Sequence, residues 1–543
     1  MPTAAGRRPG WDRAASAGRQ LLGLSWTAPS TRMAPRLTPP DRTGPMTRTA
    51  FAELEQRFSA IKDLSNGLSI LSWDQEVMMP SGGAGARAAT LAALTEVVHE
   101  RWTDPALGKL VKRLSRKGAD ITPRQRRAVE LVRVTQERAQ AVPADLARRI
   151  ALAESRGVES WRKARGERDF KLFADDLARM VDLRREQARC IAKRGKVYDA
   201  LLARFEPGAT MASIDPLLDE LVAFSTQLLE RVRSSGVTLD TSPLTGRFDV
   251  DAQRAFAQEV TAAMGIDAER SRLDTSSHPF CGGVGPGDVR LTTRYDRKDL
   301  RGALFGVIHE AGHALYEQGL DGRRARSPLG GAISMGIHES QSRLWENMVG
   351  RSRPFWRYWL PRLRRRHAAL KGVSLDAMVK AVNAIRPSMI RVEADELTYN
   401  LHIALRYRIE RDLIEGRLEV RQLPERWNAS MHEFLGVVPR HDAEGVLQDI
   451  HWASGLFGYF PTYSLGNLYA AQFMAAARKD LRGLDASIAA GDMSRLRDWL
   501  GQQIHRHDQV YDADKLVRRV TGKPLGTAAF KQHITAKVKH LYA

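Results

Sequence analysis

Two histidines and a glutamate lie within five consecutive residues near the middle of the chain: His309, Glu310 and His313. In an α-helix, residues four apart share a face, so both imidazoles can reach one cation. Glu310 would project beside them, about 100° around the helix axis, where a carboxylate can take a proton from a metal-activated water. This spacing predicts the active site of a zinc-type metallopeptidase.

The residues around this motif favour a helix packed in a core. Apolar side chains recur there at helical spacing, at Leu304, Ile308, Ala311 and Leu315. The same stretch contains three glycines: Gly302, Gly306 and Gly312. Because a glycine inside a helix costs about 0.5–1 kcal/mol relative to alanine, we expect another backbone or the substrate to approach closely there.

A catalytic zinc site needs a third protein ligand and one open coordination position. A histidine six residues after His313 is excluded, because that position is Gly319. A second predicted helix carries Glu339 and Glu346 on one face, two turns apart, so spacing alone leaves both open. Two neighbouring candidates are less well placed: Glu317 and His338.

Several short motifs then occur in the order found in one known family. They are Trp73-Asp74-Gln75, Met79-Pro80-Ser81-Gly82-Gly83 with Arg87, His278-Pro279-Phe280, Asp288-x-Arg290-x-Thr292, His309-Glu310-x-x-His313, His338-Glu339-Ser340-Gln341, Ile390-Arg391-x-x-Ala394-Asp395 and Gly445-x-x-Gln448-Asp449-x-His451-Trp452. With these motifs, the chain from about residue 46 to its end resembles the thermostable metallocarboxypeptidases of the carboxypeptidase Taq type.

The resemblance implies a set of metal-binding and catalytic residues. It implies His309, His313 and Glu339 as metal ligands. It also implies Glu310 as the general base. Arg391 would take the terminal carboxylate of the substrate, which suits the planar bidentate fork of a guanidinium.

Further residues are candidates for binding the substrate. Arg290 and His278 are expected at the substrate, and three arginines compete physically with Arg391 for the carboxylate: Arg290, Arg343 and Arg386. A helical stretch is predicted around Arg391, so Asp395 is expected to orient its guanidinium as an i,i+4 pair.

Two further residues resemble the oxyanion donors of related helical zinc peptidases. They are His451 and Tyr463, which would donate to the scissile carbonyl. Tyr399 and Tyr459 are weaker candidates for the same role.

The resemblance also implies an activity and its partners. The expected reaction is removal of single amino acids from peptides with a free C-terminus, using one divalent metal ion per chain, Zn²⁺ or alternatively Co²⁺. A helical zinc oligopeptidase, which cuts internally or releases dipeptides, would share every metal residue and is the alternative. A homodimer is suggested by the resemblance alone. A non-catalytic helical binding module would not need the intact metal-binding residues.

The elements that must position these residues are mostly helices. Apolar residues recur at helical spacing in 47–64, 123–200, 213–234, 252–264, 376–413, 422–435 and 466–505. One strand is predicted at 288–295, from its alternation and β-branched residues. The fold class is therefore mainly α. The family implies a large two-lobed helical body with a deep active-site cleft and a small β-sheet at its wall, the strand's edge free to pair with an extended peptide.

Composition limits the other function classes. The net charge of +21 could indicate a nucleic-acid binder, but the arginines alternate with acids along helical stretches. The densest basic run, 362–367, follows aromatic residues at helical spacing, and we interpret it as a solvated surface with its aromatics in the core. We therefore expect no nucleic-acid partner. No apolar run reaches the roughly 18 residues of a membrane span, so no membrane partner is expected either.

The cysteine count and the first residues suggest where the protein works. Two cysteines, Cys190 and Cys281, give no disulfide framework and suit the cytoplasm. Residues 1–45 are rich in proline and arginine, which predicts a disordered basic extension. We interpret Met46 as the true start, with a transit peptide as the alternative. Residues 46–543 are then one metallocarboxypeptidase domain.

Overall fold

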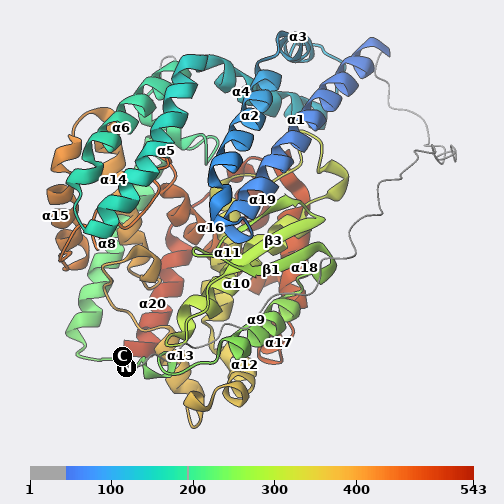
Figure 1. The fold of residues 1–543 in the computed structure, drawn as a ribbon. Helices are drawn as coiled ribbons and strands as arrows, with labels where there is room; N and C mark the ends of the chain where they lie inside the picture. Colours follow the sequence, from blue (N-terminus) through green and yellow to red (C-terminus); the bar gives the residue numbers. More distant parts are fainter. Residues whose placement is uncertain (1–44, 193–194, 543) are drawn as a thin grey trace, which may run out of the picture. The chain divides into compact units, whose positions relative to one another are not determined.

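The computed structural model describes residues 45–192 and 195–542 (Figure 1). The predicted disordered extension, 1–45, lies outside these ranges except for Pro45, at which the first helix begins. Helices dominate the described chain, so the predicted mainly α class with a small sheet is confirmed.

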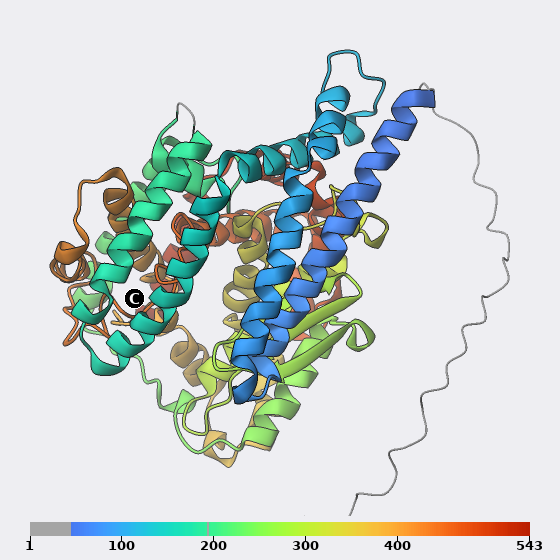
Figure 2. The ribbon, with the colours of Figure 1, turned by 45° about the horizontal axis from the view of Figure 1, so that its top comes forward.

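Nine helices precede the sheet within the described residues. They are α1 (Pro45–Val77), α2 (Ala84–Thr103), α3 (Pro105–Leu114), α4 (Pro123–Ala141), α5 (Ala144–Glu167), α6 (Lys171–Ala192), α7 (Val197–Leu202), α8 (Met211–Ser234) and α9 (Val250–Met264). α1 and α2 run side by side as a hairpin, and so do α5 and α6 (Figures 1 and 2).

Eleven helices follow the sheet in the described part of the chain. They are α10 (Leu300–Gly319), α11 (Met335–Arg343), α12 (Arg353–Arg366), α13 (Leu375–Val382), α14 (Tyr399–Glu415), α15 (Leu423–Leu435), α16 (Pro461–Asp480), α17 (Leu484–Ala489), α18 (Ser494–Gln503), α19 (Ala513–Thr521) and α20 (Ala528–Tyr542). A π-helical segment, η5 (Leu344–Gly350), continues α11 directly.

The sheet has three strands in the order β1-β3-β2: β1 (Ser271–Thr275), β2 (Cys281–Gly285) and β3 (Asp288–Thr293). β1 runs parallel to β3, with Ser271 opposite Val289, and β2 runs antiparallel to it, with Cys281 opposite Leu291. Val289 and Leu291 are buried, as the alternating pattern predicts, and β3 packs on α10 while β2 lies against α1 (Figure 1).

The strand predicted at 288–295 is therefore present, but the prediction of a free edge is wrong. β3 is the central strand and bonds to a neighbour on both sides. The outer strands come from segments that had no clear strand pattern: β2 holds three glycines among its five residues. Only the outer edges of β1 and β2 remain for any further pairing in this sheet.

Buried apolar side chains form one large cluster, which extends from α5 to α20, and a smaller one built by α1, α3 and α4. The aromatic residues before the basic run belong to the large cluster, with Phe355, Trp356 and Trp359 each at most 3% exposed. They are not available for stacking on nucleic-acid bases. None of the helices in the described ranges combines the length and hydropathy that a membrane crossing needs.

Three helices approach closely around the centre of this cluster: α10, α11 and α16. A Cβ atom on Gly312 of α10 would come within 2.6 Å of the backbone oxygen of Gln341 on α11. A Cβ atom on Gly466 of α16 would come within 2.5 Å of the Glu339 side chain, also on α11. The expected close backbone approach is thus confirmed at Gly312. A Cβ atom on Gly302 would meet no atom of another segment within 4 Å, and one on Gly306 would meet only side-chain atoms, at 3.9 Å.

Three of the predicted helical stretches, 123–200, 376–413 and 466–505, each contain more than one helix, and the break in 376–413 bears on the site. The apolar spacing across 376–413 suggested continuous helix, but the chain leaves α13 at Val382 and enters α14 only at Tyr399. Between them it is irregular apart from a short 3₁₀ turn, η7 (Arg391–Glu393). Pro387 lies in this interval, and the residue before a proline is disfavoured in helical conformation.

We predict that Gly312→Ala destabilises the protein by about 1–3 kcal/mol, because the added methyl group overlaps the α11 backbone. Gly302→Ala, on the same helix, is the matched control and is expected to stabilise by about 0.4–1 kcal/mol. Denaturant unfolding of both variants against the parent protein measures the difference. Equal stability of the two variants would contradict the proposed contact.

Candidate active site

Two capped helices carry the metal-binding candidates. The Asp299 side chain accepts a hydrogen bond from the Arg301 backbone at 2.8 Å and begins α10, which holds His309 and His313. The Ser334 hydroxyl accepts from the Ile337 backbone at 3.1 Å and begins α11. Leu304, Ile308, Ala311 and Leu315 are all buried, which holds α10 in the core as predicted.

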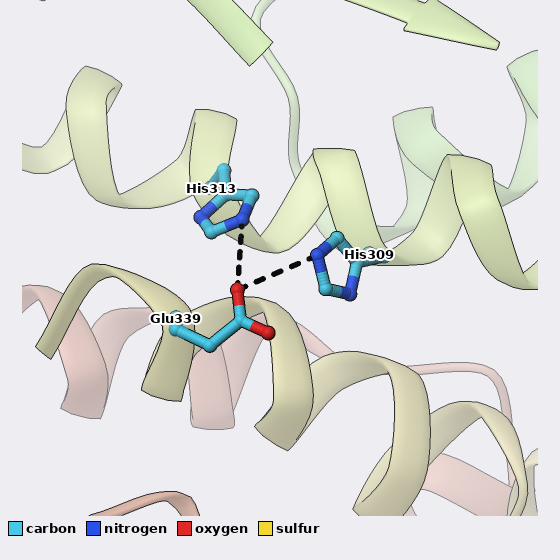
Figure 3. A group of neighbouring side chains, drawn as sticks. All are labelled: His309, His313 and Glu339. Carbon is cyan, nitrogen blue, oxygen red and sulfur yellow. Dashed lines mark ion pairs between the residues drawn. The ribbon is translucent and has the colours of Figure 1, made fainter. Parts of the chain in front are cut away.

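Three side chains from these helices converge (Figure 3). Oε2 of Glu339 lies 3.6 Å from Nε2 of His309 and 3.4 Å from Nε2 of His313. One atom from each of the three residues lies within 4.8 Å of the others, a spacing that suits a shared metal ion. Among the described residues this is the only such group.

The other ring nitrogen of each histidine is also bound. Nδ1 of His309 lies 2.9 Å from a carboxylate oxygen of Glu346. A ring that donates from Nδ1 carries its lone pair on Nε2, which is the atom that faces Glu339. Glu339 and Glu346, which spacing could not separate, thus meet opposite sides of the same imidazole.

His313 is held through a second imidazole. Its Nδ1 lies 2.5 Å from Nδ1 of His338, whose Nε2 lies 2.9 Å from a carboxylate oxygen of Glu317. If His313 carries its proton on Nδ1, that nitrogen donates to Nδ1 of His338. His338 must then carry its own proton on Nε2, which is directed at Glu317. His338 contacts the back of His313 and does not compete with Glu339. Glu317 and His338 also line a pocket of about 200 Å³.

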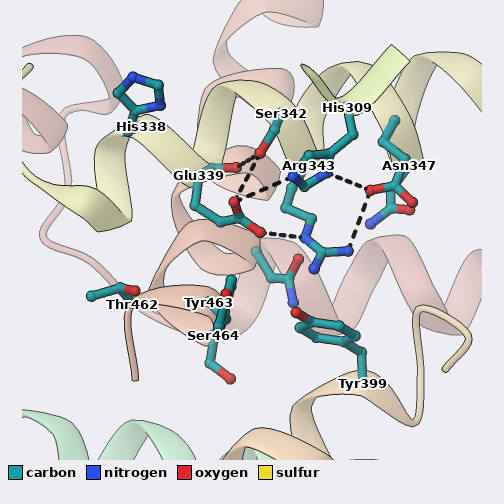
Figure 4. A network of polar contacts seen from close by, with 12 residues as sticks. His309, His338, Glu339, Ser342, Arg343, Asn347, Tyr399, Thr462, Tyr463 and Ser464 are labelled. Carbon is teal, nitrogen blue, oxygen red and sulfur yellow. Dashed lines mark hydrogen bonds and ion pairs between the residues drawn. The ribbon is translucent and has the colours of Figure 1, made fainter. Parts of the chain in front are cut away.

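Arg343 holds the second oxygen of Glu339 (Figure 4). Its Nε donates to Oε1 at 2.7 Å, one helical turn away, and its Nη1 contacts Glu346 at 3.3 Å. The Ser342 hydroxyl lies 2.7 Å from the Glu339 backbone oxygen and 3.1 Å from Oε2. Arg343 was a competitor for the substrate carboxylate, but these bonds engage it with the two glutamates instead.

Burial and neighbouring charges shift the pKa values of these groups. Burial opposes charge on His309, but Glu339 and Glu346 raise its pKa to about 9, so the ring must release its Nε2 proton when it binds a metal ion. Burial opposes charge on Glu339 as well, yet His309 and Arg343 hold its pKa well below its usual range. Burial lowers the pKa of His313 to about 4. The Glu339 carboxylate is therefore available as an anionic ligand.

Glu310 lies on α10 between the two histidines and is 6% exposed. Burial raises its pKa to about 7, although the charge of His309 works in the opposite direction. A pKa near neutrality suits a group that must both accept and release a proton.

Arg391 is buried, but its environment differs from the prediction. It lies in the short 3₁₀ turn η7 and not in an α-helix, and its Nε and Nη2 donate to Asp449 at 3.1 and 2.8 Å. Its Nη1 donates to the Tyr399 hydroxyl at 2.9 Å. The predicted pair with Asp395 is wrong: that carboxylate accepts backbone and hydroxyl hydrogen bonds from residues such as Thr398.

The segment carrying Arg391 is attached to residues 445–452. The Arg391 backbone donates to the Gln448 side chain at 2.8 Å, and Gln448 donates to the Met389 carbonyl at 3.0 Å. Asp449 also binds Arg406 of α14, with Nε at 2.7 Å. Sequence reasoning missed these partners of Arg391, although Gln448 and Asp449 stand in one of the matched motifs.

His451 and Tyr463 lie together, with Nε2 of His451 3.2 Å from the Tyr463 hydroxyl. The Arg391 guanidinium carbon lies 4.9 Å from the centre of the Tyr463 ring. Burial lowers the pKa of His451 to about 3, despite the nearby Asp449, and burial raises that of Tyr463 well above its usual value. Both side chains are therefore neutral at physiological pH.

The remaining candidates lie on or near the sheet or hold other partners. Arg290 pairs with Asp288 at 2.8 Å and lies over the Trp73 ring of α1, 4.4 Å from its centre. His278 is exposed in the loop between β1 and β2. Arg386 donates to the backbone oxygen of Leu239 at 2.7 Å.

Residues 53–538 match a family described as Carboxypeptidase Taq (M32) metallopeptidase. Thermostable carboxypeptidase 1 of Thermus thermophilus is 43% identical over 87% of this chain and 95% of that relative. Carboxypeptidase 1 of Bacillus subtilis is 36% identical over 91% of this chain and 98% of that relative. The solved M32 carboxypeptidase from Deinococcus radiodurans covers 91% of this chain and 99% of its own, with 36% identity and a TM-score of 0.88.

The contacts of Glu339 and Glu346 predict different effects on metal binding. Glu339→Ala should lose most bound metal, because it removes the oxygen that faces both Nε2 atoms. Glu346→Ala should keep about one equivalent in excess metal, with affinity reduced at most about 10–100-fold. Metal analysis and chelator competition measure both. If Glu346→Ala loses the metal and Glu339→Ala keeps it, Glu346 and not Glu339 is the third ligand.

Proposed function

The chain belongs to the Carboxypeptidase Taq (M32) family and is a metal-dependent carboxypeptidase, and from that premise we propose how its residues work. The proposed reaction hydrolyses the last peptide bond of a peptide and releases one free amino acid. His309, His313 and Glu339 would hold the metal ion. The observation that carries the proposal is the convergence of their three ligand atoms within 4.8 Å.

The donor set fits a divalent metal ion. Two imidazole nitrogens and a carboxylate oxygen are common zinc ligands and leave a coordination position open for chemistry. The hydrogen bond that Nδ1 of His309 makes to Glu346, and the one that Nδ1 of His313 makes to His338, direct both Nε2 lone pairs toward Glu339. We propose Zn²⁺ as the ion, with Co²⁺ as the alternative, since both suit nitrogen and oxygen ligands.

A metal ion held by His309, His313 and Glu339 would supply Lewis-acid chemistry, which polarises a scissile carbonyl and makes water a better nucleophile at neutral pH. Glu310, on the same helix between the two histidines, would take a proton from the attacking water and pass it to the departing amine. Tyr463 stays protonated at neutral pH and can donate a hydrogen bond to the oxygen on which negative charge develops. His451 would orient that hydroxyl by donating to its oxygen from Nε2, which leaves the hydroxyl proton for the substrate.

Arg391 would bind the terminal carboxylate of the substrate. Burial opposes its charge, but Asp449 holds the pKa of the guanidinium well above its usual range. Its contacts with Asp449 and Tyr399 use three of five N–H groups and leave one on each Nη nitrogen. Those two hydrogens can form a paired, charge-assisted contact with a carboxylate.

The cellular compartment and the oligomeric state are also proposed. The two cysteines, Cys190 and Cys281, are both free, which agrees with a reducing compartment such as the cytoplasm. The homodimer rests on family resemblance. An oligopeptidase would share the metal site, and cleavage of peptides with a blocked C-terminus would favour it over the carboxypeptidase that we propose.

We predict that Glu310→Gln keeps the bound metal and the fold but lowers turnover at least about 10²–10⁴-fold. The amide has nearly the shape of the carboxylate but cannot accept the proton. Steady-state kinetics, with metal content and thermal unfolding as controls, measure this. Near-normal turnover by a variant that holds its full complement of metal would end the assignment.

C-terminal amidation of a peptide should reduce its cleavage at least about tenfold, because the amide removes the charge that Arg391 recognises. Arg391→Ala should reduce cleavage of the free peptide by a similar factor. The two changes together should cost much less than their product, since both remove the same contact. Mass spectrometry of timed digests measures the released residues.

The control for this comparison is Arg386→Ala, which removes an arginine of the same segment whose contact is with the Leu239 backbone. It should leave the preference for a free C-terminus intact. Equal cutting of free and amidated peptides by the parent protein would refute the carboxypeptidase assignment.

A further inference from the structure

One buried tyrosine contacts two arginines of the site by different means. Tyr399 begins α14 and is 4% exposed. The Arg343 guanidinium carbon lies 4.0 Å from the centre of its ring, and Nη1 of Arg391 donates to its hydroxyl at 2.9 Å. Figure 4 shows the ring directly below the Arg343 guanidinium.

The two arginines belong to different parts of the site. Arg343 binds the Oε1 atom of Glu339 at 2.7 Å and so orients a proposed metal ligand. Arg391 is the proposed receptor of the substrate carboxylate and binds Asp449. A continuous series of contacts therefore joins the two parts: Glu339, Arg343, Tyr399, Arg391 and Asp449.

Each contact suits its arginine. A guanidinium on an aromatic face is attracted by the ring electrons, and this attraction strengthens when water is excluded, as it is around a side chain so little exposed. The hydroxyl oxygen is an acceptor that fixes the rotation of the Arg391 guanidinium about its long axis, because Asp449 alone binds only one edge.

We propose that Tyr399 is a positioning residue with two separable actions: its hydroxyl orients Arg391 for the substrate carboxylate, and its ring holds Arg343 against Glu339. The first action rests on the proposed role of Arg391. Tyr399 was also a weak candidate for donating to the scissile carbonyl. Its burial, and its contacts with an arginine on the ring and another at the hydroxyl, favour the positioning role.

Two substitutions separate the actions. Tyr399→Phe removes the hydroxyl and keeps the ring, whereas Tyr399→Leu removes both. Tyr407→Phe is the matched control, because Tyr407 is a buried tyrosine of the same helix whose hydroxyl binds Asp215 at 2.6 Å. The measurements are kcat and KM on one peptide with a free and with an amidated C-terminus, apparent Zn²⁺ affinity by chelator competition, and thermal unfolding.

Tyr399→Phe is expected to raise KM for the free peptide about tenfold or more, with kcat and Zn²⁺ affinity within about twofold of the parent. Tyr399→Leu should in addition weaken Zn²⁺ binding about 10–100-fold. Tyr407→Phe should change thermal stability alone. A purely structural role for Tyr399 would move thermal stability without this separation of KM from metal affinity.

The opposing outcomes are distinct. An unchanged KM in Tyr399→Phe overturns the role of the hydroxyl, and a fall in kcat at constant KM makes Tyr399 a donor to the reacting atoms instead. Unchanged Zn²⁺ affinity in Tyr399→Leu overturns the role of the ring. If Arg391→Ala also leaves the preference for free termini intact, the proposed function of Arg391 fails. If Arg391→Ala abolishes that preference while Tyr399→Phe does not, the role of Arg391 stands and only the inference about Tyr399 fails.

Discussion

A carboxylate with almost no contact with water, that of Glu339, sets the arrangement of the helices around it. An unpaired charge in a protein interior costs several kcal/mol, so its partners must remain in place. Arg343 supplies a cation to one oxygen, and the His309 and His313 rings face the other. The close approach of α16 at Gly466 excludes water from this group. The need to pair the buried Glu339 carboxylate therefore both fixes the neighbouring helices and leaves that carboxylate in place as a ligand for a cation.

Much of the site could be read from the sequence, because it depends on local geometry. The i,i+4 spacing of His309 and His313 needs only one regular helix, and the apolar stripe beside them predicts which face is buried. The helical class follows from the same periodicity. The choice between Glu339 and Glu346 needed more, since both approach His309 and only the structure distinguishes the ring nitrogen that each one meets.

What could not be predicted depends on contacts between distant segments. Arg391 was assigned a partner one helical turn away, but its carboxylate comes from Asp449, 58 residues later. The spacing of apolar residues does not indicate such a distant partner. The pair with Asp395 required a helix around Arg391, but the chain is irregular before α14. The position of β3 within the sheet was unpredictable for a similar reason: its neighbour β2 is largely glycine, which gives no pattern to find.

The π-helical segment after α11 has a consequence for how this chain can change over evolutionary time. Its wider turn holds an extra residue, and all seven of its residues are buried. Loss of Leu344 or Trp345, the two residues of the segment that precede Glu346, would rotate Glu346 by about 100° relative to Glu339, away from the ring that they share. Descendants of this sequence should therefore accept exchanges of one side chain for another in 344–350 more readily than any insertion or deletion.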